Sequence, residues 1–121
     1  MNESVYKRKL VAEINLMPRA YAVRIEDRFA VGRLDLIIKL PDKPVIWVEG
    51  KIVDGYQFEP TMRQYEEGLL IEAAGMMALL IGWKSGVMHI SPWVEKADAR
   101  SCFTAEKLSY AKTLVSYLEQ Q

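Results

Sequence analysis

Two carboxylates and a lysine occur at spacings that let them act on one phosphate group. Glu49 and Lys51 are two residues apart in the apolar run 45–53, and Asp35 lies in a second apolar run, 33–40. Side chains alternate between the two faces of a β-strand, so Glu49 and Lys51 should share a face, with Cα atoms roughly 6.5 to 7 Å apart. An adjacent strand carrying Asp35 would place its carboxylate beside them. The sequence therefore predicts a cluster of two acids and one base.

Such a cluster is typical of a divalent metal site. Two carboxylates in a partly dry cleft repel each other unless a cation lies between them or one takes up a proton. Mg²⁺ or Mn²⁺ suits this role, because such ions prefer oxygen ligands and leave positions for water and phosphate. We predict Asp35 and Glu49 as metal ligands, with the backbone carbonyl of Gly50 as a further ligand because glycine permits close approach. Lys51 is then expected to orient the attacking water and to offset charge in the transition state.

The context of the triplet Glu49-Gly50-Lys51 gives it weight. A glutamate and a lysine two residues apart most often form only a solvated ion pair at a strand edge. Here they interrupt a run that is otherwise typical of a central, buried strand, where nearly continuous apolar sequence is expected. Charged residues at such positions indicate a functional site.

The elements predicted around this site form an α/β fold. The strand, long helix and strand in the middle of the chain predict a right-handed crossover that makes strand 76–83 parallel to its partner. We expect one domain, residues 1–121, with a central mixed sheet flanked by helices. The predicted elements are a helix at 3–17, strands at 20–26, 33–40 and 45–53, a helix at 60–74 with Pro60 at its first position, strands at 76–83 and 87–90, and a final helix from a cap at Thr104 to about residue 119.

Polar residues on the predicted helices are candidates to complete the site. Glu3, near the start of the first helix, would extend the metal shell, and Glu13 is the competitor if the helix docks differently. An acid at a helix start is also commonly present for the helix dipole. Gln64 lies one turn into its helix and shares a face with Gly68 and Ile71, which would direct its amide toward the cleft.

The order of these residues resembles the PD-(D/E)XK nucleases, and within them the small stand-alone virus-type replication-repair nuclease (VRR-NUC) domains common in bacteriophages. The likeness covers most of the chain. One departure is that the family usually has proline before the aspartate, where this chain has Leu34; that proline shapes the backbone and does no chemistry. The resemblance is carried by Glu3, the segment 24–29, Gly32-Arg33-Leu34-Asp35, Glu49-Gly50-Lys51 and Gln64.

The resemblance implies a restriction-endonuclease-like core and a Mg²⁺-dependent DNA endonuclease in which Gln64 supports the active site. It also implies a bacteriophage origin and a symmetric homodimer that favours branched DNA such as four-way junctions, since two sites related by a twofold axis match a twofold junction. One alternative is a catalytically silent nuclease fold that binds DNA or a protein. Another is a soluble α/β interaction protein. A P-loop enzyme is disfavoured, because Gly50-Lys51 lacks the preceding glycine-rich loop and the following Ser or Thr.

Composition sets the remaining limits. Sixteen basic and sixteen acidic residues give a net charge of zero, which counts against tight nonspecific binding to DNA. A single cysteine and a single histidine exclude an internal disulfide and a Cys/His zinc cluster, and no run reaches the roughly 18 apolar residues of a membrane span. These features favour the cytoplasm of a bacterial or phage-infected cell. The basic residues expected to contact substrate are Lys7, Arg28, Arg33 and Arg63.

Overall fold

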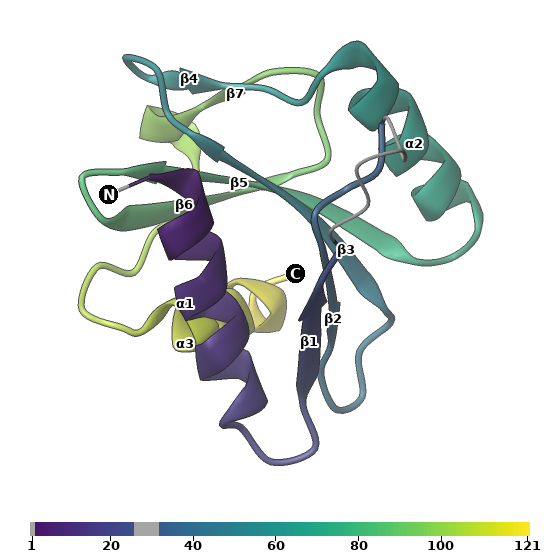
Figure 1. Cartoon of the computed structure of the whole chain (residues 1–121), viewed down its shortest axis with the longest axis vertical. Helices are drawn as coiled ribbons and strands as arrows, with labels where there is room; N and C mark the ends of the chain where they lie inside the picture. The colour runs from purple at the N-terminus through teal and green to yellow at the C-terminus, as the bar shows by residue number, and fades with distance from the viewer. Residues whose placement is uncertain (1, 26–31) are drawn as a thin grey trace.

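The computed structural model describes residues 2–25 and 32–121, and its central feature is a five-stranded sheet (Figure 1). The strands lie in the order β1 (Tyr21–Arg24), β2 (Leu36–Lys39), β3 (Ile46–Ile52), β5 (Met77–Lys84) and β6 (Val87–Pro92). A second, two-stranded sheet pairs β4 (Gln57–Phe58) with β7 (Ala97–Asp98), and a short 3₁₀ helix spans Ala99–Ser101. The helices are α1 (Glu3–Asn15), α2 (Met62–Ala73) and α3 (Tyr110–Glu119).

The central sheet is mixed, as the sequence predicts. β3 and β5 are parallel and are joined through α2, whereas the pairs β1–β2, β2–β3 and β5–β6 are antiparallel. The parallel pair lies in the middle of the sheet, so β3 has a neighbouring strand on both sides. This position explains why its sequence is nearly continuously apolar apart from Glu49 and Lys51.

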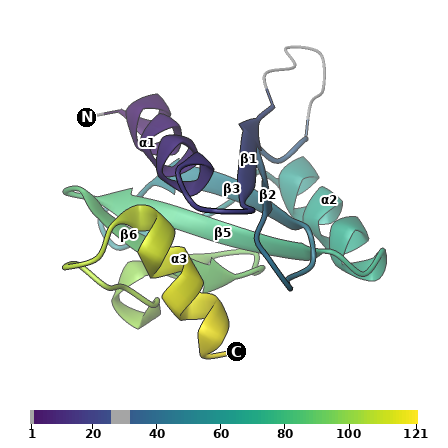
Figure 2. The same cartoon turned by 90° about the horizontal axis from the view of Figure 1, so that it is seen from below.

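The two faces of the sheet carry two separate hydrophobic clusters. On one face, Ile46 and Val48 of β3 pack with residues of α1 and α3. On the other face, Leu80 of β5 packs with Ile71 of α2 and with Trp93. Figure 2 shows α2 set apart from α1 and α3 across the sheet. Glu49 and Val48 are adjacent in β3, so their side chains point to opposite faces of the sheet. The side chain of Glu49 therefore lies on the face that α2 covers.

Close packing against Trp93 fixes the position of α2. A Cβ atom added at Gly68 would lie 2.0 Å from Cε2 of Trp93, so only glycine lets the helix approach this ring. The indole Nε1 of Trp93 also donates a hydrogen bond to the carbonyl oxygen of Tyr65, 3.0 Å away. Together the two contacts hold the start of α2 over the face of the sheet that carries Glu49.

Two predicted helix starts are wrong. Thr61 caps α2, so Pro60 precedes the helix instead of occupying its first position. The last helix is capped by Ser109 and not by Thr104. The chain before Thr104 is still extended, because Phe103 exchanges two backbone hydrogen bonds with Ile90, at 2.9 and 3.1 Å.

None of the helices in residues 2–25 and 32–121 combines the length and apolar character needed to cross a membrane.

Candidate active site

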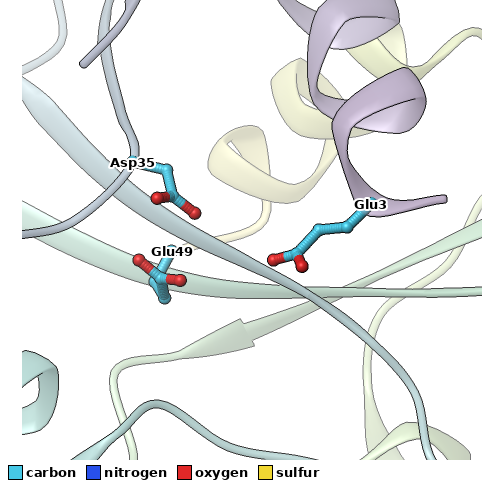
Figure 3. A group of neighbouring side chains, drawn as sticks. All are labelled: Glu3, Asp35 and Glu49. Carbon is cyan, nitrogen blue, oxygen red and sulfur yellow. The ribbon is translucent and has the colours of Figure 1, made fainter. Parts of the chain in front are cut away.

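Three carboxylates converge where β2 and β3 separate (Figure 3). The last residue pair between these strands is Leu36 with Val48, and Asp35 comes immediately before β2. Glu49 follows Val48 on β3, and Glu3 reaches the same point from the first turn of α1. One oxygen from each carboxylate lies within 4.8 Å of the other two. Three segments far apart in the sequence therefore each contribute an acid to a space that one cation could occupy.

The structure distinguishes Glu3 from Glu13, the two candidates for the third acid of the site. Glu3 belongs to the acid cluster, as described above. Glu13 lies farther along α1, where its Oε1 accepts a hydrogen bond from the backbone N–H of Ala111 at 3.0 Å. That N–H is in the first turn of α3 and has no partner within the helix. Glu13 therefore joins α1 to α3, and Glu3 is the acid that accompanies Asp35 and Glu49.

Glu49 is the most deeply buried member of the cluster. Its side chain is 1% exposed; Oε2 lies 3.3 Å from the ammonium group of Lys51, and Oε1 has no hydrogen-bond partner among the described residues. Burial and the negative charge of Asp35 raise the pKa of Glu49 to about 8, although Lys51 acts in the opposite direction. A buried carboxylate with a free oxygen needs either a proton or a cation.

Lys51 extends from Glu49 toward solvent. Its side chain is 24% exposed and lines a pocket of about 220 Å³ together with residues of β4 and the loop before it. Glu49 and Lys51 lie on the same face of β3, as the period of a strand predicts. The ammonium group is thus held by a buried acid and is accessible to a molecule entering from solvent.

Lys7 lies in the acid cluster instead of on an exposed surface. It is 5% exposed, and its ammonium group donates a hydrogen bond to Oε1 of Glu3 at 2.8 Å and another to Oδ2 of Asp35. Burial lowers the pKa of Lys7, but the hydrogen bonds to Asp35 and Glu3 raise it overall, so the group stays charged. The sequence carried a signal for one of these contacts, because Glu3 and Lys7 are four residues apart on a helix.

Gly50 provides space on the opposite face of β3. A Cβ atom at this position would lie 2.6 Å from Cζ3 of Trp83 and 3.0 Å from Cε of Lys7. Trp83 in turn stacks on Tyr6 of α1, with ring centroids 5.6 Å apart. Glycine in the triplet therefore lets α1 dock closely enough for Lys7 to reach the acids. A role for the Gly50 carbonyl as a metal ligand stays a prediction.

Gln64 forms a capping box with Thr61 at the start of α2. The side-chain Oε1 of Gln64 accepts a hydrogen bond from the backbone N–H of Thr61 at 2.9 Å. The backbone N–H of Gln64 donates a hydrogen bond to Oγ1 of Thr61 at 3.2 Å. The buried face of the helix includes Gly68 and Ile71, as expected. The amide oxygen is thus used within α2, and a contribution of Gln64 to the active site stays a prediction.

Two of the arginines predicted to bind substrate lie beside a close contact between α2 and the segment before Asp35. Arg33 and Arg63 are both exposed. Gly32, with φ +89°, is packed so tightly that an added Cβ atom would lie 2.9 Å from Cβ of Arg63. The start of α2 therefore contacts the segment that leads to Asp35. Arg28 lies outside the described residues.

Comparisons with known proteins establish the fold. No protein-family model matches the sequence, and no curated protein is similar to it. Among solved structures, the chain is similar to Hjc, a Holliday junction resolvase from the archaeal hyperthermophile Archaeoglobus fulgidus, with a TM-score of 0.66 and 14% sequence identity. The match covers 90% of this chain and 97% of the resolvase. The predicted restriction-endonuclease-like core, with a mixed sheet flanked by helices, is confirmed.

Proposed function

We propose that the protein is a divalent-metal-dependent endonuclease that hydrolyses phosphodiester bonds in DNA. The observation that carries this proposal is the convergence of Glu3, Asp35 and Glu49, with one oxygen of each within 4.8 Å of the others. Lys51 adds a charged donor that is both bound to Glu49 and open to solvent. The shared fold with a Holliday junction resolvase agrees with this proposal.

The donor set suits Mg²⁺ or Mn²⁺. All three groups offer carboxylate oxygens, which these hard ions prefer, and no soft ligand is among them. The strongest indication is Oε1 of Glu49, which is buried and has no hydrogen-bond partner among the described residues. Asp35, Glu49 and Glu3 would hold the ion, and the Gly50 carbonyl is proposed as a further ligand.

The ion and the side chains around it have different roles in the proposed reaction. A bound divalent ion supplies Lewis acidity, which lowers the pKa of water and offsets the charge of the phosphate. Lys51 donates hydrogen bonds from the solvent side, where it orients the attacking water and stabilises the extra negative charge of the transition state. Glu49 holds the ammonium group of Lys51 in place at 3.3 Å.

DNA binding is proposed to depend on geometry more than on total charge, since the chain is neutral. Arg33 and Arg63 are exposed beside the segment that leads to Asp35, and we propose that they contact backbone phosphates. The proposed substrate is branched DNA, in particular a four-way junction, and a twofold junction would suit a symmetric homodimer. The name of the Archaeoglobus protein supports the choice of this substrate.

One observation favours a fold that binds DNA without cutting it. Lys7 contacts both Glu3 and Asp35 and neutralises their charge, as a structural ion pair would. In that case the acid cluster would stabilise the docking of α1, and the exposed arginines would still bind a branched duplex. Measurements of binding and of cleavage separate the two functions.

The test uses a panel of labelled DNA substrates with Mg²⁺, Mn²⁺ or EDTA: a four-way junction, a flap, a single strand and a linear duplex. We expect cleavage only with a divalent ion, and faster cleavage of the junction than of the linear duplex. Binding of the junction with no cleavage under either metal would favour the silent fold. If the protein neither binds nor cuts any substrate, it is better explained as an interaction protein.

A further inference from the structure

We propose that Lys7 is an exchangeable counter-ion of the acid cluster: its ammonium group holds Glu3 and Asp35 together and leaves them when a divalent ion binds. This inference rests on the proposed metal site. It assigns to Lys7 a positioning role, because the lysine acts through the carboxylates that would bind the ion.

The geometry makes the lysine and the ion competitors for the same oxygens. Lys7 donates hydrogen bonds to Glu3 and Asp35, which are two of the three acids, and its side chain is buried among them. Mg²⁺ binds oxygen at about 2.0 to 2.1 Å, so an ion at the centre of the cluster would lie close to the present ammonium group. Two positive charges at such a distance repel each other strongly, because little water screens them in a buried site.

The balance of charge leads to the same result. Glu49 would bind an ion as a carboxylate, so the cluster would then contain three negative charges, from Glu3, Asp35 and Glu49, and two ammonium groups, from Lys7 and Lys51. A divalent ion would bring the sum to +1, and release of Lys7 would return it to zero. Lys51 keeps its partner because it contacts Glu49 from the solvent side. Lys7 is therefore the cation that the ion displaces, and once released it is free to contact a phosphate of the substrate.

Only the end of the Lys7 side chain has to move for this exchange. The stem of Lys7 passes over Gly50, and a Cβ atom there would lie 3.0 Å from Cε of the lysine. Rotation about the last bonds of the side chain can move the ammonium group while the stem stays against β3. The helix itself remains fixed by the stacking of Tyr6 on Trp83.

The test is the affinity for Mn²⁺ measured by isothermal titration calorimetry without DNA, combined with thermal unfolding in EDTA and in Mn²⁺. Lys7→Met keeps the apolar stem but removes the charge. Arg8→Met removes one positive charge from an exposed neighbour on the same helix and is the matched control. We expect Lys7→Met to bind Mn²⁺ at least ten-fold more tightly than the native chain, to unfold at a lower temperature in EDTA, and to gain more stability from the ion. Lys7→Arg and Arg8→Met should bind Mn²⁺ like the native chain.

Equal or weaker Mn²⁺ affinity in Lys7→Met would overturn the exchange while leaving the metal site intact. If neither the native chain nor the variant binds Mn²⁺, the metal site fails and the inference fails with it. Native protein gives an independent readout that requires no variant. Reductive methylation should leave the buried Lys7 amine unmodified in EDTA and modify it in Mn²⁺, whereas protection in both conditions would contradict the proposal.

Discussion

The carboxylate of Glu49 lies 3.3 Å from the ammonium group of Lys51, yet the glutamate is 1% exposed and the lysine side chain is 24% exposed. The pair thus extends from the interior of the sheet to its surface. Only one oxygen of Glu49 is used in this contact, because the other has no partner among the described residues. A pair that served structure alone would be expected to satisfy both oxygens of the buried acid.

Glu49 should give the metal-free protein a distinctive pH dependence of stability. Burial and the charge of Asp35 raise the pKa of Glu49 to about 8, above the ordinary value of 4.5 expected in the unfolded chain. Between these two values the native state holds a proton that the unfolded state has lost. The free energy of unfolding therefore falls as pH rises through this window. Urea unfolding in EDTA from pH 5 to pH 9 measures the slope.

Glu49→Gln is the control for this pH dependence. The amide cannot ionise, so the variant should lose the part of the slope that belongs to Glu49 and should be more stable than the native chain near pH 9. Parallel pH profiles for the native chain and the variant would show that Glu49 has an ordinary pKa in the folded protein.

Gly68→Ala should destabilise the protein although alanine favours helix formation. Helix propensity alone predicts a gain of about 1 kcal/mol. The added methyl group, however, would lie 2.0 Å from the ring of Trp93, so α2 must move away from the sheet. Overpacking of this kind typically costs about 1 to 3 kcal/mol, and the net change should be a loss. A free energy of unfolding equal to or above the native value would contradict the packing described for α2.

Gln64→Glu separates the two roles of this residue. Glutamate preserves a capping box, so the variant should stay within about 0.5 kcal/mol of native stability, whereas Gln64→Ala should lose about 1 kcal/mol. If the amide supports the active site, Gln64→Glu should also cleave junction DNA more slowly, because it has lost its N–H donors and gained a charge. Chemical unfolding and a cleavage time course measure the two properties. If Gln64→Glu cleaves junction DNA at the native rate, Gln64 has only a capping role.

Local periodicity was enough to predict how the central strands pair and which charged residues share a face. The period of two placed Glu49 and Lys51 on one face of β3, and the strand-helix-strand order predicted the parallel pairing of β3 with β5. The resemblance to nucleases strengthened the case for Glu3 and Gln64, and the structure brings Glu3 into the acid cluster. These features depend on residues close in sequence or on one regular crossover.

Features that depend on tertiary contacts could not be predicted in the same way. The position of Lys7 is determined by the docking of α1, which relies on the fit of Trp83 and Tyr6 over Gly50. The strands β4 and β7 have two residues each, too few to show any periodicity. The start of α3 was predicted too early, because Thr104 is a suitable cap residue but follows the extended pairing of Phe103 with Ile90.

The most direct measurement is the rate at which the native chain, Asp35→Asn and Asp42→Asn cleave a labelled four-way junction in Mg²⁺ and in Mn²⁺. Asp42 is an exposed turn residue with φ 61°, a conformation that asparagine also tolerates, so it makes a matched control. The proposed mechanism predicts a loss of at least about 100-fold for Asp35→Asn, with native activity in Asp42→Asn and junction binding retained in all three. Equal cleavage by the native chain and Asp35→Asn, or no cleavage by the native chain with either metal, would contradict it.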